Sequence, residues 1–283
     1  LLIDEAETHL HIDAQANLVD TFMVQDTADK IIYTTHSPAC LPPDLGMGVR
    51  AVLPKESELG ISEIHNGFWS RGPGFSPLML AMGAGASAFT PARYAVLAEG
   101  PSEMILLPTL LRRAVGASAL EYQIAPGLSE APMQIYPELD LSAARVAFLV
   151  DGDSGGANLR KGLIEHSISD DKIIVLGATT LENLLDPDSY LQCVKELMGE
   201  INTDAELPEF PALPEFDGES RTKVLSAWAK SNDLRLPSKV AVASALIERG
   251  LANVTDNSKA TLTRLDAEIR RALGIKRGTA KIR

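Results

Sequence analysis

Five carboxylates each follow an apolar stretch closely, where a strand would end and a helix would begin. They are Glu99, Glu103, Asp151, Asp153 and Glu182. Carboxylates gathered in one place repel one another unless cations neutralise them, so the pattern predicts hard divalent ions with oxygen ligands. Two such ions about 3.5–4 Å apart suit phosphodiester chemistry, because one activates a water and the other stabilises the leaving oxygen.

Strands of a parallel sheet are the elements that must position these acids. The stretches 94–98, 145–150 and 172–176 are apolar runs, typical of strands buried on both faces. Residues just past the carboxyl ends of such strands face one crevice, so the fold would bring the acids together. Helical patterns at 102–114, 156–166 and 181–200 alternate with the strands, which predicts an α/β fold. Further strands are predicted at 1–3, 30–33, 49–53 and 61–65, and a further helix at 12–26.

Each acid taken singly has a simpler explanation. Glu103 and Glu182 fall in first helical turns, where negative charge is favourable to the helix dipole. Helix capping does not explain the whole set of acids. It explains least well the stretch 151–156, whose sequence is Asp-Gly-Asp-Ser-Gly-Gly. Its glycines permit tight turns and would let a phosphate backbone approach closely.

A second pair of acids ends an earlier apolar strand. Asp4 and Glu5 follow residues 1–3, so one carboxylate can face a Mg²⁺ hydration shell and the other an attacking water. His36 follows the strand predicted at 30–33. Buried strands that end in acids are common, and His9 and His11 also fit the polar start of a helix. No GxxxxGK[ST] motif occurs in the chain, so we expect it not to bind or hydrolyse ATP unaided.

The two early segments together resemble the Walker B strand and the switch-histidine segment of ABC-type ATPases. The resemblance implies that Asp4 associates with Mg²⁺, that Glu5 is the general base and that His36 senses the γ-phosphate. Ala6-Glu7 stands where the family usually has Pro-Glu.

The later acids resemble those of a Toprim domain, a metal-binding fold of topoisomerases, primases and some nucleases. The residues that carry the likeness are Glu99-Gly100-Pro101-Ser102-Glu103, Asp151-Gly152-Asp153 and Leu181-Glu182-Asn183. An ABC-type segment followed by Toprim is the arrangement of the OLD family of ATP-dependent endonucleases, which includes the nuclease subunit of Gabija-type phage defence. The likeness covers about residues 1–195.

This resemblance implies a Toprim-type Rossmann-like parallel sheet with flanking helices. We expect the end of an ABC-type ATPase domain at 1–90, the Toprim core at 91–200, and an acidic linker with a helical segment at 201–283. The implied cofactors are two Mg²⁺ or Mn²⁺ ions held by the five acids, with ATP used only by the full-length protein. Because the chain starts at Leu1 rather than at Met, we expect a fragment or excised domain.

In that family, Glu99 and Asp151 would be catalytic as well as metal-binding, and a lysine near the start of a late helix closes the site. Lys239 is the best match and would neutralise the scissile phosphate or the transition state. An exposed lysine at a helix start is an equally good explanation of its position. Lys259 is the competing candidate.

The distribution of charge along the chain limits the classes of binding partner that we expect. The formal net charge of −12 disfavours a general nucleic-acid coat or a peripheral membrane binder, which rely on broad positive potential. It does not exclude a metal-dependent nuclease. Residues 202–220 hold six acids, no bases and three prolines, which predicts an extended, solvated connector, whereas 256–283 net +5. The predicted DNA-binding cations are Arg160, Lys161, Arg270 and Arg271, although a basic tail is equally typical of a solvated helix face.

The leading hypothesis is therefore a metal-dependent DNA endonuclease. Its alternatives are a non-catalytic Toprim platform for DNA binding or assembly, and another Toprim enzyme of the primase or topoisomerase kind. The resemblance also implies a homodimer and a helicase partner. No apolar run approaches the roughly 20 residues of a membrane helix, and no signal peptide is recognisable, so we expect a cytoplasmic protein without a membrane partner.

Overall fold

A computed structural model describes residues 1–37, 40–42, 44, 48–55, 60–65, 94–126, 128–129 and 145–275. The boundary predicted between residues 90 and 91 and the last four bases of the segment 256–283 lie outside these residues. In the described parts, no helix is long and apolar enough to span a membrane.

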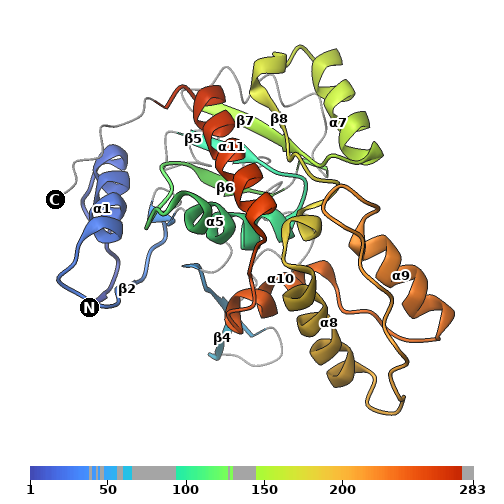
Figure 1. Ribbon diagram of the computed structural model, residues 1–283. Helices are drawn as coiled ribbons and strands as arrows, with labels where there is room; N and C mark the ends of the chain where they lie inside the picture. Colours follow the sequence, from blue (N-terminus) through green and yellow to red (C-terminus); the bar gives the residue numbers. More distant parts are fainter. Residues whose placement is uncertain are drawn as a thin grey trace.

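A four-stranded parallel sheet lies at the centre of the molecule (Figure 1). Its strands are β5 (Tyr94–Leu97), β6 (Gln123–Ala125), β7 (Arg145–Val150) and β8 (Ile173–Val175), in the spatial order β6-β5-β7-β8. The predicted α/β fold with a parallel sheet and flanking helices is confirmed. The short strand β6 was not predicted, because three residues carry too little periodicity to mark a strand.

Side chains of the central strands alternate between two apolar layers. Ala147 and Leu149 of β7 belong to the larger core cluster, and Val146, Phe148 and Val150 to the smaller one. Burial on both faces explains why the strands are apolar without interruption. The smaller layer lies under α7 (Ser154–Glu165), whereas α5 (Pro101–Val115) and α11 (Asp256–Ala272) cover the opposite face.

The helices after residue 180 belong to the same core as the sheet. The predicted helix at 181–200 is divided into a 3-10 turn, η5 (Leu181–Leu184), and the helix α8 (Pro187–Ile201). The chain then forms α9 (Arg221–Ser231), α10 (Lys239–Glu248) and α11. Their buried side chains, such as Leu225, Leu246 and Leu262, join the cluster that contains β5 and β7.

The acidic connector 202–220 contains no helix or strand, and it is only partly solvated. Leu207, Phe210, Leu213 and Phe216 pack against the core, while the acids between them are exposed. This spacing of three residues equals the repeat of a polyproline II helix, which the three prolines favour. The Phe210 ring lies 4.3 Å from the Trp228 ring of α9, so the connector is bound to the body along one side.

The N-terminal residues form two small sheets. In one, β1 (Leu2–Ile3) pairs in parallel with β2 (Ile32–Tyr33), and α1 (Ile12–Val24) connects them. In the other, β3 (Ala51–Pro54) pairs with β4 (Ser62–His65) in antiparallel register. Both sheets agree with the strands predicted there.

If α11 shares one core with the sheet, Leu262→Ala will destabilise the whole unit. Leu262 is fully buried, and its truncation leaves a cavity that costs about 2–5 kcal/mol. We expect one lowered unfolding transition, followed by chemical denaturation with both fluorescence and circular dichroism. Thr263→Ala, at the exposed neighbouring position, is the control. Loss of α11 in a separate early transition would contradict a shared core.

Candidate active site

The turn after β5 carries the first two acids. Gly100 is the N-cap of α5, and the Glu103 Oε2 atom, three residues later, accepts the Gly100 backbone N–H at 2.9 Å. Glu103 is buried at this helix start. Burial raises the pKa of Glu103 to about 7, and the nearby Glu182 adds to the shift, whereas Lys239 opposes it. Glu103 therefore both stabilises the helix start, as its position predicted, and faces other acids.

The turn after β7 carries the next two acids. The backbone N–H of Asp151 donates to Glu99 Oε1 at 2.8 Å, which joins the ends of β7 and β5. Burial raises the pKa of Asp151 to about 8, with further contributions from Glu103, Glu99 and Glu182 and an opposing one from Lys239. Asp151 therefore interacts electrostatically with three other acids and with Lys239.

The glycines of this turn are required by the protein's own backbone. A Cβ atom on Gly152 would lie 2.3 Å from the Ala178 carbonyl oxygen, and one on Gly156 would lie 2.1 Å from that of Asp151. Both positions exclude any side chain. Close packing of β7, α7 and the turn after β8 thus accounts for these glycines without a phosphate ligand.

Asp153 is used differently from Asp151. It is the N-cap of α7, and its Oδ1 atom accepts the N–H groups of Gly155 and Gly156 at 2.8 and 3.1 Å. Its Oδ2 atom lies 3.4 Å from Lys223 Nζ. Partial burial raises the pKa of Asp153, but the Gly156 N–H and Lys223 outweigh it and hold that pKa below the ordinary value.

Glu182 enters the site from η5. Its side chain is buried, and Lys239 Nζ of α10 lies 3.5 Å from its Oε1 atom. Burial lowers the pKa of Lys239, but Glu182, Glu103 and Asp151 outweigh it, so that pKa is raised. Lys239 is thus the lysine that faces the acids. Lys259 is exposed on the first turn of α11 and has no contact with them among the described residues.

The acids lie near one another, but they do not form a coordination sphere that could hold a metal ion without rearrangement. Among the described residues, no three His, Cys, Asp or Glu side chains lie close enough together to hold a metal ion. The acids have partners within the chain instead: Glu99 accepts the N–H of Asp151, Glu103 accepts that of Gly100, and Glu182 faces Lys239. Glu103, Asp151, Glu182 and Lys239 therefore form an electrostatic group, with Glu99 beside it.

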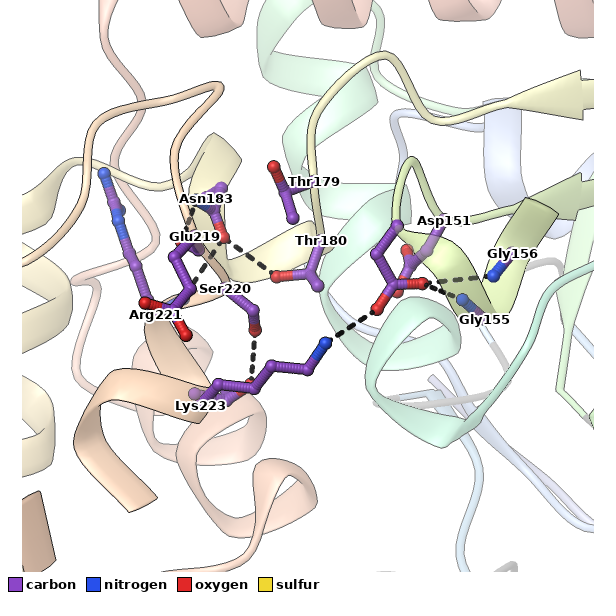
Figure 2. A network of polar contacts seen from close by, with 12 residues as sticks. Asp151, Gly155, Gly156, Thr179, Thr180, Asn183, Glu219, Ser220, Arg221 and Lys223 are labelled. Carbon is purple, nitrogen blue, oxygen red and sulfur yellow. Dashed lines mark hydrogen bonds and ion pairs between the residues drawn. The ribbon is translucent and has the colours of Figure 1, made fainter. Parts of the chain in front are cut away.

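A polar network behind η5 positions this side of the site (Figure 2). Arg221, only 2% exposed, donates from Nη1 to the carbonyls of Glu182 and Leu185 at 3.0 and 2.7 Å, and from Nε to that of Pro214 at 3.0 Å. Asn183 donates to two carbonyls of the connector, Glu215 and Glu219, both at 3.1 Å. Sequence reasoning missed Arg221 and Lys223, because their partners lie far away in the chain.

Three of the four predicted DNA-binding cations contact carboxylates of their own chain. The pairs are Arg160 with Asp170, Lys161 with Glu165, and Arg270 with Asp266 and Glu121. Arg271 is exposed. The pairs of Arg160 and Lys161 are exposed, so they are weak and exchange with other anions, whereas Arg270 is only 20% exposed and faces the buried Asp266. The role of these cations in DNA binding stays a prediction.

The predicted nucleotide-site residues lie on neighbouring turns. Asp4 and Glu5 follow β1, and His36 follows the adjacent β2. The Thr34 hydroxyl donates to Asp4 Oδ1, and the backbone N–H of His36 donates to Glu7 Oε1 at 2.7 Å. The structure therefore brings the two segments together, with Glu7 as a link between them, whereas their nucleotide role stays a prediction.

Comparisons with protein-family models and with curated proteins gave no match. Among solved structures, the chain is similar to the C-terminal region of the OLD protein of Xanthomonas campestris pv. campestris. The identity is 13% and the TM-score 0.38, over 65% of this chain and 97% of that chain. It is also similar to the C-terminal region of the Burkholderia pseudomallei OLD protein, with 15% identity and a TM-score of 0.28 over 65% and 96% of the two chains. Both are OLD proteins, the family that the sequence motifs resemble.

Replacing Arg221 with Met will test the network behind the site. Three carbonyls would lose a buried donor, and each unsatisfied group costs about 1–3 kcal/mol. We expect the free energy of unfolding to fall by about 3–5 kcal/mol in urea denaturation. Lys230→Met, at an exposed position on the same helix, is the control and should change stability little. Equal stability of the two variants would contradict the role given to Arg221.

Proposed function

We propose that the chain is a metal-dependent DNA endonuclease module that hydrolyses phosphodiester bonds at the acidic end of its sheet. One observation carries the proposal: buried Glu103 and Glu182, half-buried Asp151 and the cation Lys239 face one another beyond the ends of β5, β7 and β8. A set of buried like charges is expensive to maintain, and its position is the usual ligand crevice of parallel sheets. The OLD-type motifs of the sequence supply the reaction class.

The residues present fit hard divalent cations in their chemistry. Burial raises the pKa of Glu103 and that of Asp151, neighbouring acids add to both shifts, and Lys239 opposes them only in part. The Glu182 Oε2 atom is buried and has no hydrogen-bond partner among the described residues. Carboxylate oxygens are the preferred ligands of Mg²⁺ and Mn²⁺. Because each acid also contacts its own chain, a binding ion must replace some of these contacts.

In this proposal, Glu99, Glu103, Asp151, Asp153 and Glu182 hold the ions. When bound, two divalent ions supply an activated water and a stabilised leaving oxygen. The chain's own residues bind and orient the substrate and exclude bulk water. Lys239 is already charged by its acidic surroundings, so it can bind the scissile phosphate and stabilise the charge that develops there.

Divalent ions should stabilise the folded chain before any DNA is added. Free Mn²⁺ at about 100 times its dissociation constant adds about 2.7 kcal/mol, which raises Tm by about 5–10 °C in a domain of this size. Calorimetry with and without Mn²⁺ measures the shift. We expect Asp151→Asn to lose most of it, whereas Asp171→Asn, an exposed change just before β8 and so at the end of that strand opposite the acids, keeps it. An equal shift in both variants would place the bound ion elsewhere.

Plasmid cleavage tests the activity directly. Supercoiled DNA incubated with the chain and Mg²⁺ or Mn²⁺ should become nicked or linear, and chelation should stop the reaction. Because loss of an outer-shell partner alone costs 10–100-fold in metal enzymes, Glu99→Gln and Asp151→Asn should each lower the rate at least about 100-fold. Asp171→Asn should not change it. Equal cleavage by all variants would indicate a contaminant and contradict the site.

A non-catalytic Toprim platform for DNA binding is the second candidate. The absence of a ready three-ligand group among the described residues favours it, because a binding platform needs no coordination sphere. The same plasmid experiment separates the two functions. DNA that is retarded in a gel by the parent chain but stays intact with both metals would support the platform.

A further inference from the structure

Lys223 faces the acidic end of the sheet although its sequence context does not mark it. Its Nζ atom lies 3.4 Å from Oδ2 of Asp153, on a different element. The other oxygen of this carboxylate, Oδ1, is fixed by the N–H groups of Gly155 and Gly156. The backbone of α7 thus holds one oxygen of Asp153, and Lys223 faces the other.

The position of Lys223 is set by a buried anchor. Arg221, two residues earlier, fixes the first turn of α9 to the carbonyls of Glu182 and Leu185. Figure 2 shows Arg221 and Lys223 leaving this turn in different directions, Lys223 toward the turn of Gly155 and Gly156. The segment that carries Glu182 into the site therefore also positions a second lysine beside it.

The pair between Lys223 and Asp153 is built to exchange. At 3.4 Å it is longer than the 2.7–2.9 Å typical of strong charge-assisted hydrogen bonds. The Lys223 side chain is 60% exposed and that of Asp153 is 21% exposed, so water competes for both partners. Lys239 differs, because it faces three acids from a half-buried position and has less freedom to leave them.

We propose that Lys223 is an exchangeable counterion that becomes a contact for the DNA backbone. It neutralises Asp153 until a divalent cation takes that carboxylate, and it then binds a phosphate of the DNA substrate. A cation on Asp153 repels the ammonium group, and a nearby phosphate is the anion that attracts it. This inference rests on the proposed nuclease function and adds a substrate-binding residue that carries no family motif.

DNA affinity measured with and without a divalent ion tests the exchange. Ca²⁺ binds the same kind of carboxylate oxygens as Mg²⁺ and serves as the probe. Anisotropy of a labelled duplex is followed over a range of salt, in Ca²⁺ and in EDTA, for the parent chain, Lys223→Gln and Lys230→Gln. Lys230 is exposed in the last turn of the same helix, so the two variants carry equal net charge.

In Ca²⁺, loss of one phosphate contact makes the slope of log affinity against log salt shallower by about 0.9. We expect this change in Lys223→Gln and not in Lys230→Gln. The defect should be about threefold larger at about 50 mM salt than at about 200 mM. In EDTA the two variants should bind alike, because Asp153 then holds the lysine. Lys223→Arg, which keeps the charge, should restore binding in Ca²⁺, which a merely unfolded variant could not show.

Two results overturn the proposal. Equal binding by Lys223→Gln and Lys230→Gln in Ca²⁺ would show that Lys223 does not contact a phosphate. A binding defect of equal size in Ca²⁺ and in EDTA would show that Lys223 does not exchange between Asp153 and DNA. Plasmid cleavage by the parent separates this inference from the nuclease proposal. If the parent cleaves DNA but Lys223→Gln binds DNA like Lys230→Gln, only this inference is wrong. If the predicted binding pattern is found but the parent does not cleave DNA, only the nuclease proposal is wrong.

Discussion

Burial of several carboxylates at one end of a parallel sheet is the constraint on which the rest of the structure depends. Burial raises the pKa of Glu103 to about 7 and that of Asp151 to about 8; Glu182 adds to both shifts, and Glu103 adds to that of Asp151. Such a group is stable only if positive charge or N–H donors face it. The turns of α5 and α7 supply the donors, and Lys239 supplies a positive charge.

This constraint explains why the C-terminal third of the described chain belongs to the sheet. The sheet and its first helices carry the acids, whereas Lys239 and Lys223 come from α10 and α9. The connector binds the body through a row of apolar side chains, and Arg221 fixes α9 to η5. The acidic and basic halves of the site thus lie far apart in sequence and meet through one shared core.

The N-terminal segment also meets the sheet at defined places. Arg112 on α5 lies 3.2 Å from Asp44, and Gln123 of β6 donates to the Pro42 carbonyl at 3.1 Å. The same helix, α5, carries Glu103 at its opposite end. The segment that follows His36 in the chain and the acidic site therefore contact one rigid element from its two ends.

Local patterns by themselves determined the parallel strands β5, β7 and β8, the starts of α1, α5 and α7 to within two residues, and the acids that follow the strands. They could do so because strands buried on both faces are uninterrupted apolar runs. Glu99, Asp151 and Glu182 each follow such a run within a few residues. Short apolar runs also placed β1 and β2, and with them the turns that carry Asp4 and His36.

Only the tertiary structure decided which polar groups each acid faces. Asp153 caps α7 and meets Lys223, although 70 residues separate the two, and no local pattern encodes such a contact. The burial of Arg221 follows from packing against the connector, whose composition alone indicated a solvated linker. The break between η5 and α8 is local by contrast, because the Asp186 side chain caps α8 and Pro187 is the first residue of that helix. The distances between the charged groups of this site are set by the folded core and not by their spacing in the sequence, because the elements that carry them meet only through long-range contacts.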